Sequence, residues 1–161
     1  MIELVVVVAV LGILAAAAIA LVDPLSQIQK ANDSKRKSDL NQIRKGLELY
    51  YQNNARYPDT VSPTDYRIKS LVPDQGAIDW GTPWPPFMDS LPKDPSSSKK
   101  YIYVVSPTGQ AYYLYANLDR GGKDTMACNV GGTDCSSVPV ANACGSGKPC
   151  NYGITSPNVS P

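Results

Sequence analysis

Two hydrophobic patterns follow each other at the start of the chain. Residues 4–22 read LVVVVAVLGILAAAAIALV, and none of these nineteen side chains carries a charge. A helix of this length spans roughly 28 Å, close to the ~30 Å hydrocarbon core of a bilayer. Proline then interrupts the pattern at Pro24, because it removes a backbone hydrogen bond and clashes with the preceding turn. We expect residues 1–24 to form a hydrophobic helical segment that needs an apolar environment.

A second helix is predicted from Leu25 to about Asn53. Asp23 suits its N-cap and Pro24 its first turn, while the polar residues after Asn53 and then Pro58 mark its end. Apolar side chains at helical spacing form one stripe, made of Leu40, Ile43, Leu47 and either Tyr50 or Tyr51. The opposite face carries Lys35, Lys37, Gln42 and Lys45. We expect this basic face to be solvated or interfacial rather than a nucleic-acid surface.

The residues after this helix divide into an irregular region and a hairpin. Residues 58–95 contain eight prolines, which favours a long loop with at most a helical turn near 66–71. Its aromatic side chains are expected to pin it to the core, although a proline-rich ligand for a partner domain is an alternative. Residues 101–105 and 111–116 are rich in tyrosine and β-branched residues and predict an antiparallel hairpin. One face of that hairpin should pack on the apolar stripe of the long helix, which gives an α+β fold.

Composition narrows the chemistry that this chain can perform. It has 161 residues, a net charge of +1 and no histidine. Without histidine, the most common general base and the usual zinc and haem ligands are missing. No pocket motif with paired carboxylates stands out, so we expect neither an enzyme nor a cofactor.

All four cysteines lie in residues 125–161, a nearly uncharged tail rich in glycine, serine and proline. None of their spacings gives the C-x-x-C of a metal or redox site, and their even number favours two disulfides in an oxidising compartment. Three pairings are possible, and proximity favours Cys128–Cys135 with Cys144–Cys150. Stapled in this way, the tail should form a compact surface loop on the head that residues 25–161 are expected to build.

The segment between the hairpin and the tail, residues 117–124, reads NLDRGGKD. Its acids, Asp119 and Asp124, are weak candidates for ligands of a hard cation. Their spacing does not match an EF-hand loop, which needs acids at alternate positions and a closing glutamate. We expect a turn here and no bound metal.

Glu3 stands immediately before the apolar run and needs an explanation. A secretory signal peptide would have a shorter apolar run and a basic rather than an acidic start. A plain signal anchor would place the basic residues 30–45 on the cytoplasmic side, whereas the cysteines favour the outside. Neither alternative provides a cation for the Glu3 carboxylate, which would be unfavourable inside an apolar environment.

The sequence Met1-Ile2-Glu3-Leu4, the apolar run with Gly12, Pro24 and the amphipathic helix closed by Ala55-Arg56-Tyr57-Pro58 together resemble type IV pilins and pseudopilins. The motifs cover about residues 1–58, and the rest is similar in plan only. In this family a leader peptidase removes a basic leader, and the new terminal amine of one subunit meets the matching glutamate of its neighbour. The family usually has four residues ahead of that glutamate, so the resemblance implies two residues before Met1.

The resemblance implies a mechanical function in which many copies bundle their apolar helices into a helical filament. Its assembly residues would be Glu3, Leu4, Gly12 and Pro24, and the segment between Gly12 and Pro24 could unwind on packing. Its partners would be further copies of the chain, the inner-membrane assembly machinery, the leader peptidase and the membrane; DNA or a surface ligand is possible.

Three functions remain open from the sequence. The four cysteines favour the major pilin of an extracellular type IV pilus that serves adhesion, motility or DNA uptake, located in the inner membrane before assembly. The first alternative is a type II secretion pseudopilin. Pseudopilins often have a calcium-binding loop instead of disulfides, and residues 117–124 leave such a loop open. The second is a membrane-anchored binding domain that does not polymerise.

Overall fold

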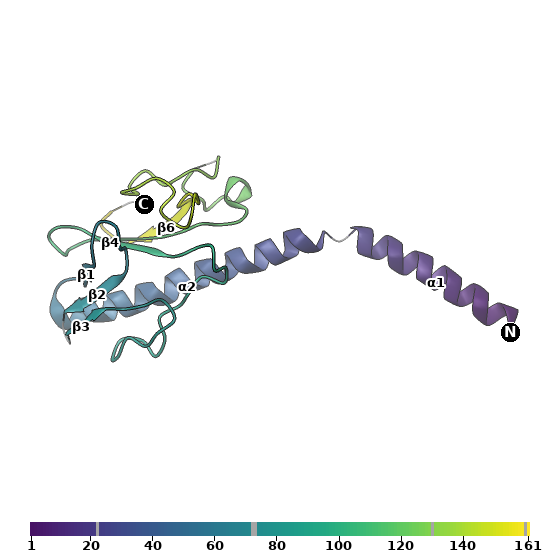
Figure 1. The fold of residues 1–161 in the computed structure, drawn as a ribbon, viewed down its shortest axis with the longest axis horizontal. Helices are drawn as coiled ribbons and strands as arrows, with labels where there is room; N and C mark the ends of the chain where they lie inside the picture. Colours follow the sequence, from purple (N-terminus) through teal and green to yellow (C-terminus); the bar gives the residue numbers. More distant parts are fainter. Residues whose placement is uncertain (22, 72–73, 130, 160) are drawn as a thin grey trace.

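A long helical stalk carries a head made of two small sheets (Figure 1). The computed structural model describes residues 1–161 except residues 22, 72–73, 130 and 160. The two helices are α1 (Ile2–Leu21) and α2 (Pro24–Asn54). The strands and a 3-10 helix follow as β1 (Asp59–Thr60), β2 (Ile68–Leu71), β3 (Asp74–Ala77), β4 (Ile102–Val105), β5 (Tyr112–Ala116), η1 (Gly121–Lys123) and β6 (Tyr152–Thr155).

The ends of α2 have the predicted caps. The Asp23 side chain accepts a hydrogen bond from the backbone N–H of Ser26 at 3.3 Å, and Pro24 occupies the first turn. At the other end Ala55 has a left-handed conformation with φ 56°, and its N–H donates to the Tyr51 carbonyl at 2.7 Å. Both boundaries of the amphipathic helix are therefore confirmed. The predicted end of the first helical run, Val22, lies outside the described residues.

The larger sheet has the strand order β4-β5-β6 and is antiparallel throughout. Its first pair is the predicted hairpin, with Tyr103 opposite Leu114. The expectation that the whole tail is a surface loop is wrong, because β6 lies in the tail and pairs with β5, placing Tyr152 opposite Ala116. A surface loop was expected because this strand is short and is flanked by glycine, proline and asparagine.

Each face of this sheet is covered by a different part of the chain. On one face, alternate side chains such as Tyr101, Tyr103 and Leu114 share a core with the apolar stripe of α2, whose Leu40, Ile43, Leu47 and Tyr50 are almost fully buried. The other face contributes Ile102 and Tyr115 to a second cluster with Cys135, Cys144 and Cys150. The period of two in the strands therefore places helix and tail on opposite sides of the sheet, in line with the order of layers in Figure 1.

The proline-rich region contains the smaller sheet, with strand order β1-β2-β3. The helical turn expected near residues 66–71 is wrong, because Ile68–Leu71 is the central strand of this sheet. Ile68 and Ser70 are buried while their neighbours are partly exposed, which is the period of a strand. The aromatic side chains do hold the following loop against the core, because Trp84 is fully buried. Its ring centroid lies 5.1 Å from that of Phe87 and 5.8 Å from that of Tyr50.

Candidate assembly site

The surface of α1 is apolar and uncovered within one chain. Large apolar side chains along it expose between 49% of their area at Val10 and 82% at Ile2. Figure 1 shows α1 extending away from the head. Soluble proteins rarely leave a continuous apolar surface of this length open, and such surfaces usually mark a partner or a membrane. The membrane-span criteria of length and hydropathy are not met by any helix within the described residues.

The predicted assembly residues lie along this helix and at its junction with α2. Glu3 is in the first turn of α1, where the helix dipole favours an acid, and among the described residues it forms no ion pair. Leu4 is 71% exposed. A Cβ atom at Gly12 would meet no atom within 4 Å, so packing within the chain does not require glycine there. A small residue on a helix surface allows another helix to approach closely. A single chain does not bring these residues together, and their roles stay predictions.

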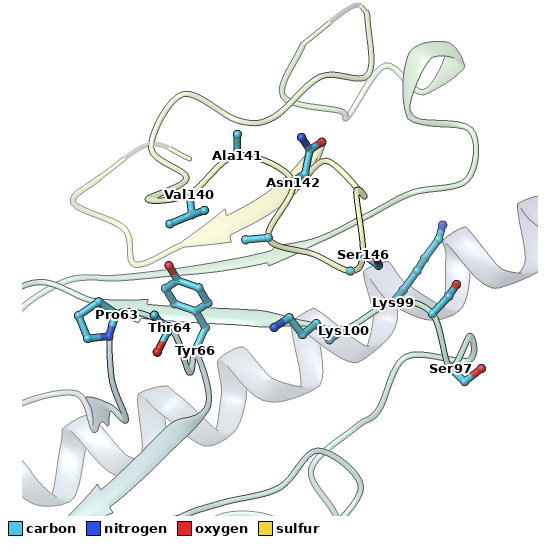
Figure 2. A pocket seen from close by; sticks show the side chains of 13 residues that line it. Pro63, Thr64, Tyr66, Ser97, Lys99, Lys100, Val140, Ala141, Asn142 and Ser146 are labelled. Atoms are coloured by element: carbon cyan, nitrogen blue, oxygen red, sulfur yellow. The ribbon is translucent and has the colours of Figure 1, made fainter.

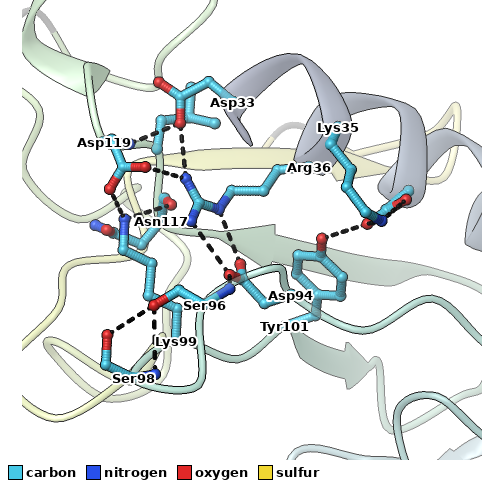
Figure 3. Close-up of polar contacts among 12 residues, drawn as sticks. Asp33, Lys35, Arg36, Asp94, Ser96, Ser98, Lys99, Tyr101, Asn117 and Asp119 are labelled. Carbon is cyan, nitrogen blue, oxygen red and sulfur yellow. Dashed lines mark hydrogen bonds and ion pairs between the residues drawn. The ribbon is translucent and has the colours of Figure 1, made fainter. Parts of the chain in front are cut away.

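The head is held by a buried arginine that the sequence pattern did not reveal. Arg36 lies four residues before Leu40, in line with the apolar stripe of α2, and has no exposed surface. The predicted basic face is solvated, since Lys35, Gln42 and Lys45 are exposed and Lys37 is half-buried. Its guanidinium donates to Asp33 at 2.9 Å, to Asp94 at 2.9 and 3.2 Å, and to Asp119 at 2.7 Å (Figure 3). Burial alone lowers the pKa of Arg36, but the hydrogen bonds that it donates to Asp94 and Asp119 raise its pKa above the usual value. Arg36 therefore ties α2 to the loops before β4 and after β5.

A second polar link joins α2 to the start of β4. The Tyr101 hydroxyl donates to Asp39 at 2.7 Å, and Lys35 donates to the same carboxylate at 2.7 Å. Burial, together with the neighbouring Asp39 carboxylate, raises the pKa of Tyr101 above its usual value. The hydroxyl therefore stays protonated and keeps donating to Asp39 at neutral pH.

The two weak candidates for cation ligands both face cationic side chains. Asp119 accepts from Arg36 and from Lys99, and Asp124 accepts from Lys37 at 2.6 Å. Burial on its own raises the pKa of each of these carboxyls, but the hydrogen bonds from the cations hold both pKa values below the ordinary range. Among the described residues no three acids, cysteines or histidines gather as metal ligands would. Lysine and arginine thus occupy the place that a bound cation would take beside these acids.

The tail has the disulfide pairing that proximity favoured. Cys128 pairs with Cys135 and Cys144 with Cys150, with Cα–Cα distances of 5.1 and 5.2 Å. The second disulfide is fully buried beneath the sheet. The Asp134 carboxylate accepts from the backbone N–H of Cys150 at 2.6 Å, which ties the two stapled loops to each other. The tail is therefore a packed layer of the head.

An open pocket lies between this tail and the loops before β2 and β4 (Figure 2). Its lining carries hydroxyl and lysine side chains, among them Thr64, Ser97 and Lys100, and no acid or cysteine among the described residues. Lys99 also lines it, but its ammonium group is directed to Asp119. Tyr66, Lys99 and Lys100 are the titratable side chains among the described residues that line it.

The site residues that sequence reasoning missed are those joined over long sequence distances. Arg36 meets Asp94 across 58 positions and Asp119 across 83. Two local signals were present: Arg36 lies four residues before Leu40, in line with the apolar stripe, and three residues after Asp33.

Comparisons with known proteins give a consistent result. The family model described as "Type II secretion system (T2SS), protein G" matches residues 24–133, from the first residue of α2 into the stapled tail. A protein of Pseudomonas aeruginosa named type II secretion system core protein G is 30% identical over 137 residues, which cover 83% of this chain and 92% of that protein. No solved structure matches the chain significantly.

Proposed function

The chain belongs to the family of type II secretion system protein G, and from this premise we propose that it is a pseudopilin, a structural subunit of a helical filament used in protein secretion. The family match supports this alternative better than the major pilin that the four cysteines favoured. Disulfides are compatible with either function, since they stabilise the head and do not touch the assembly helix. A structural family also fits the expectation that the chain is not an enzyme.

The observation that carries the proposal is the uncovered apolar surface of α1. Each buried leucine or valine side chain contributes roughly 1.5–3 kcal/mol, so bundling α1 helices from many copies offsets the loss of lipid contacts. The contact is between different surfaces of successive copies and does not close, so the assembly grows as a helix. Before assembly, we place α1 in the inner membrane with the head on the periplasmic side. Family membership favours a periplasmic filament over the extracellular one expected from the sequence.

Glu3 would set the position of each subunit along the filament. A carboxylate buried among apolar helices without a partner is strongly destabilising, typically by about 3–5 kcal/mol. The resemblance to pilins provides a cation for it, the terminal amine of a neighbouring subunit. Only a stagger that brings these two groups together would then be stable. The predicted unwinding between Gly12 and Pro24 would act after this step, when the helices pack.

The test is neutralisation of Glu3 in the full chain. We expect Glu3→Gln to reduce the amount of sedimentable filament at least tenfold, because the register-setting ion pair is lost. Thermal unfolding of the head should not change, since Glu3 is remote from it. Asp89→Asn is the matched control, because Asp89 is an exposed acid of the head without an ion pair among the described residues. A Glu3→Gln chain that assembles like the wild type would contradict the register-setting role of Glu3. A wild-type chain that forms no sedimentable filament would instead support a membrane-anchored domain that does not polymerise.

A further inference from the structure

The end of the head nearest α1 is built by the loop that contains η1, coloured green in Figure 1. This loop lies over the first turns of α2, where Arg120 and Lys123 line a shallow pocket together with Asp23, Ser26 and Gln29. A second pocket beside it joins Arg120 and Lys123 to Lys30 one turn further along α2. Three cationic side chains from two distant parts of the chain therefore gather at this end.

Most acids in this region form ion pairs, whereas three of its cations form none among the described residues. The Asp33 carboxylate accepts from Arg36 and from the backbone N–H groups of Asp119 and Arg120, which fixes the loop on the helix. Asp119 and Asp124 are held by Arg36, Lys99 and Lys37. By contrast, Lys30, Arg120 and Lys123 form no ion pair within the part of the chain that the structure describes. The remaining acid is Asp23, whose side chain caps α2.

The position of these cations along the chain matches the depth of lipid headgroups. Asp23 and Ser26 follow Leu21, the last residue of α1, by only two and five positions, so both lie close to the end of the apolar helix. The polar layer on each side of a bilayer is about 5–7 Å thick. With α1 in a membrane, Arg120 and Lys123 would therefore lie in the phosphate layer. Met126, which is 62% exposed and adjoins this loop, adds an apolar side chain suited to the same interface.

We propose that Lys30, Arg120 and Lys123 form a surface that binds the phosphate groups of anionic phospholipids while the subunit is anchored. The inference rests on the proposed function, because it needs α1 to occupy a bilayer. Arg36 is a positioning residue for this surface, since it holds the loop that carries Arg120 and Lys123. Leaving the membrane for a filament then requires these lipid contacts to be broken, so anionic lipid opposes extraction of the subunit.

The experiment is hydrogen exchange of the full chain in nanodiscs of phosphatidylcholine alone or mixed with phosphatidylglycerol. Juxtamembrane cations each change partitioning by roughly fivefold. We expect amides of residues 120–126 to exchange about five times more slowly in the discs with phosphatidylglycerol, and this protection to disappear at high salt. The double variant Arg120→Gln with Lys123→Gln should lose it. Lys45→Gln with Lys100→Gln removes the same charge from exposed lysines elsewhere and should keep it.

The amides of α1 in the same data separate the two proposals. Protection of α1 in both kinds of disc, with the loop protected only by phosphatidylglycerol, supports the lipid surface. Equal exchange of the loop amides in both kinds of disc overturns the lipid-binding surface but not the proposal that α1 anchors the subunit in the membrane. Unprotected α1 amides in both discs overturn anchoring, and the lipid surface with it. Loop protection that rises with protein concentration but not with phosphatidylglycerol assigns the surface to a second copy of the chain and overturns the lipid assignment.

Discussion

The helices α1 and α2 follow each other in the chain but differ in how far their side chains are buried and paired. Large apolar side chains of α1 expose between 49% and 82% of their area, whereas α2 buries the Arg36 side chain together with its apolar stripe. The positive charge of Arg36 on α2 is neutralised within the chain by Asp33, Asp94 and Asp119. The acid on α1, Glu3, has no such partner among the described residues.

This difference separates the interactions that fold the head from those that assemble it. Interactions satisfied within one chain can be removed only at the expense of the head's stability. Interactions left open on α1 can be removed without affecting the head, and their loss should appear only in assembly. The Glu3 variant tests an interaction left unsatisfied on α1. The three predictions below test interactions that are satisfied within the head.

The largest expected effect is that of Arg36→Met. Removing the guanidinium leaves the buried carboxylates of Asp33 and Asp94 without a cation among the described residues, while Asp119 keeps Lys99. Breaking a buried ion pair in this way typically destabilises by about 3–5 kcal/mol. Urea unfolding of the full chain in detergent measures this loss. Lys45→Met, at an exposed lysine of the same helix, should change stability by less than about 0.5 kcal/mol. A loss below about 1 kcal/mol for Arg36→Met would mean that apolar packing, and not the charge network, holds the loops to α2.

The next effect is that of the buried disulfide. Replacing Cys144 and Cys150 by serine removes a crosslink that closes a short loop, worth about 2 kcal/mol, and places two hydroxyls where the sulfurs have no exposed surface. We expect the same change at Cys128 and Cys135 to destabilise less, because Cys128 is only partly buried. Denaturant unfolding of the two double variants compares them directly. Equal losses would show that chain crosslinking alone matters and that burial beneath the sheet adds nothing.

The smallest effect is on the pH dependence of stability. The pKa of Asp119 is held below its ordinary value of 3.8 by Arg36 and Lys99, although burial opposes this. A carboxyl with a lowered folded pKa stabilises above its unfolded pKa, and this stability is lost as the pH falls through the folded value. The head should therefore weaken below about pH 3.8. In Asp119→Asn that decline should be shallower, with about 1 kcal/mol less stability at neutral pH. Thermal unfolding as a function of pH measures the low-pH decline and the stability at neutral pH. If the decline in Asp119→Asn is as steep as in the wild type, Asp119 is not the group whose lowered pKa causes it.

Local periodicity predicted the elements whose partners are near in sequence. The stripe on α2 follows from apolar residues spaced three to four positions apart, and the hairpin of β4 and β5 from alternation with a period of two. The disulfide pairing was predictable because both disulfides close short loops. The contacts of Arg36 with Asp94 and Asp119 could not be predicted, because these acids lie in loops 58 and 83 positions away. Strand β6 was missed for a related reason, since its partner β5 precedes the whole stapled tail. The Glu3 and Gly12 assignments depend on other molecules and remain predictions.

The position of β6 has a consequence for the order in which the protein matures. Ribosomes and export channels release a chain from its N-terminus, so the hydrophobic stalk is delivered well before Tyr152–Thr155. Until those four residues arrive, the tyrosine-rich strand β5 has an open edge, and such edges invite pairing with other chains. A nascent chain is thus most vulnerable to aggregation in the interval between delivery of its stalk and emergence of its last residues, and a chaperone would have its greatest effect then.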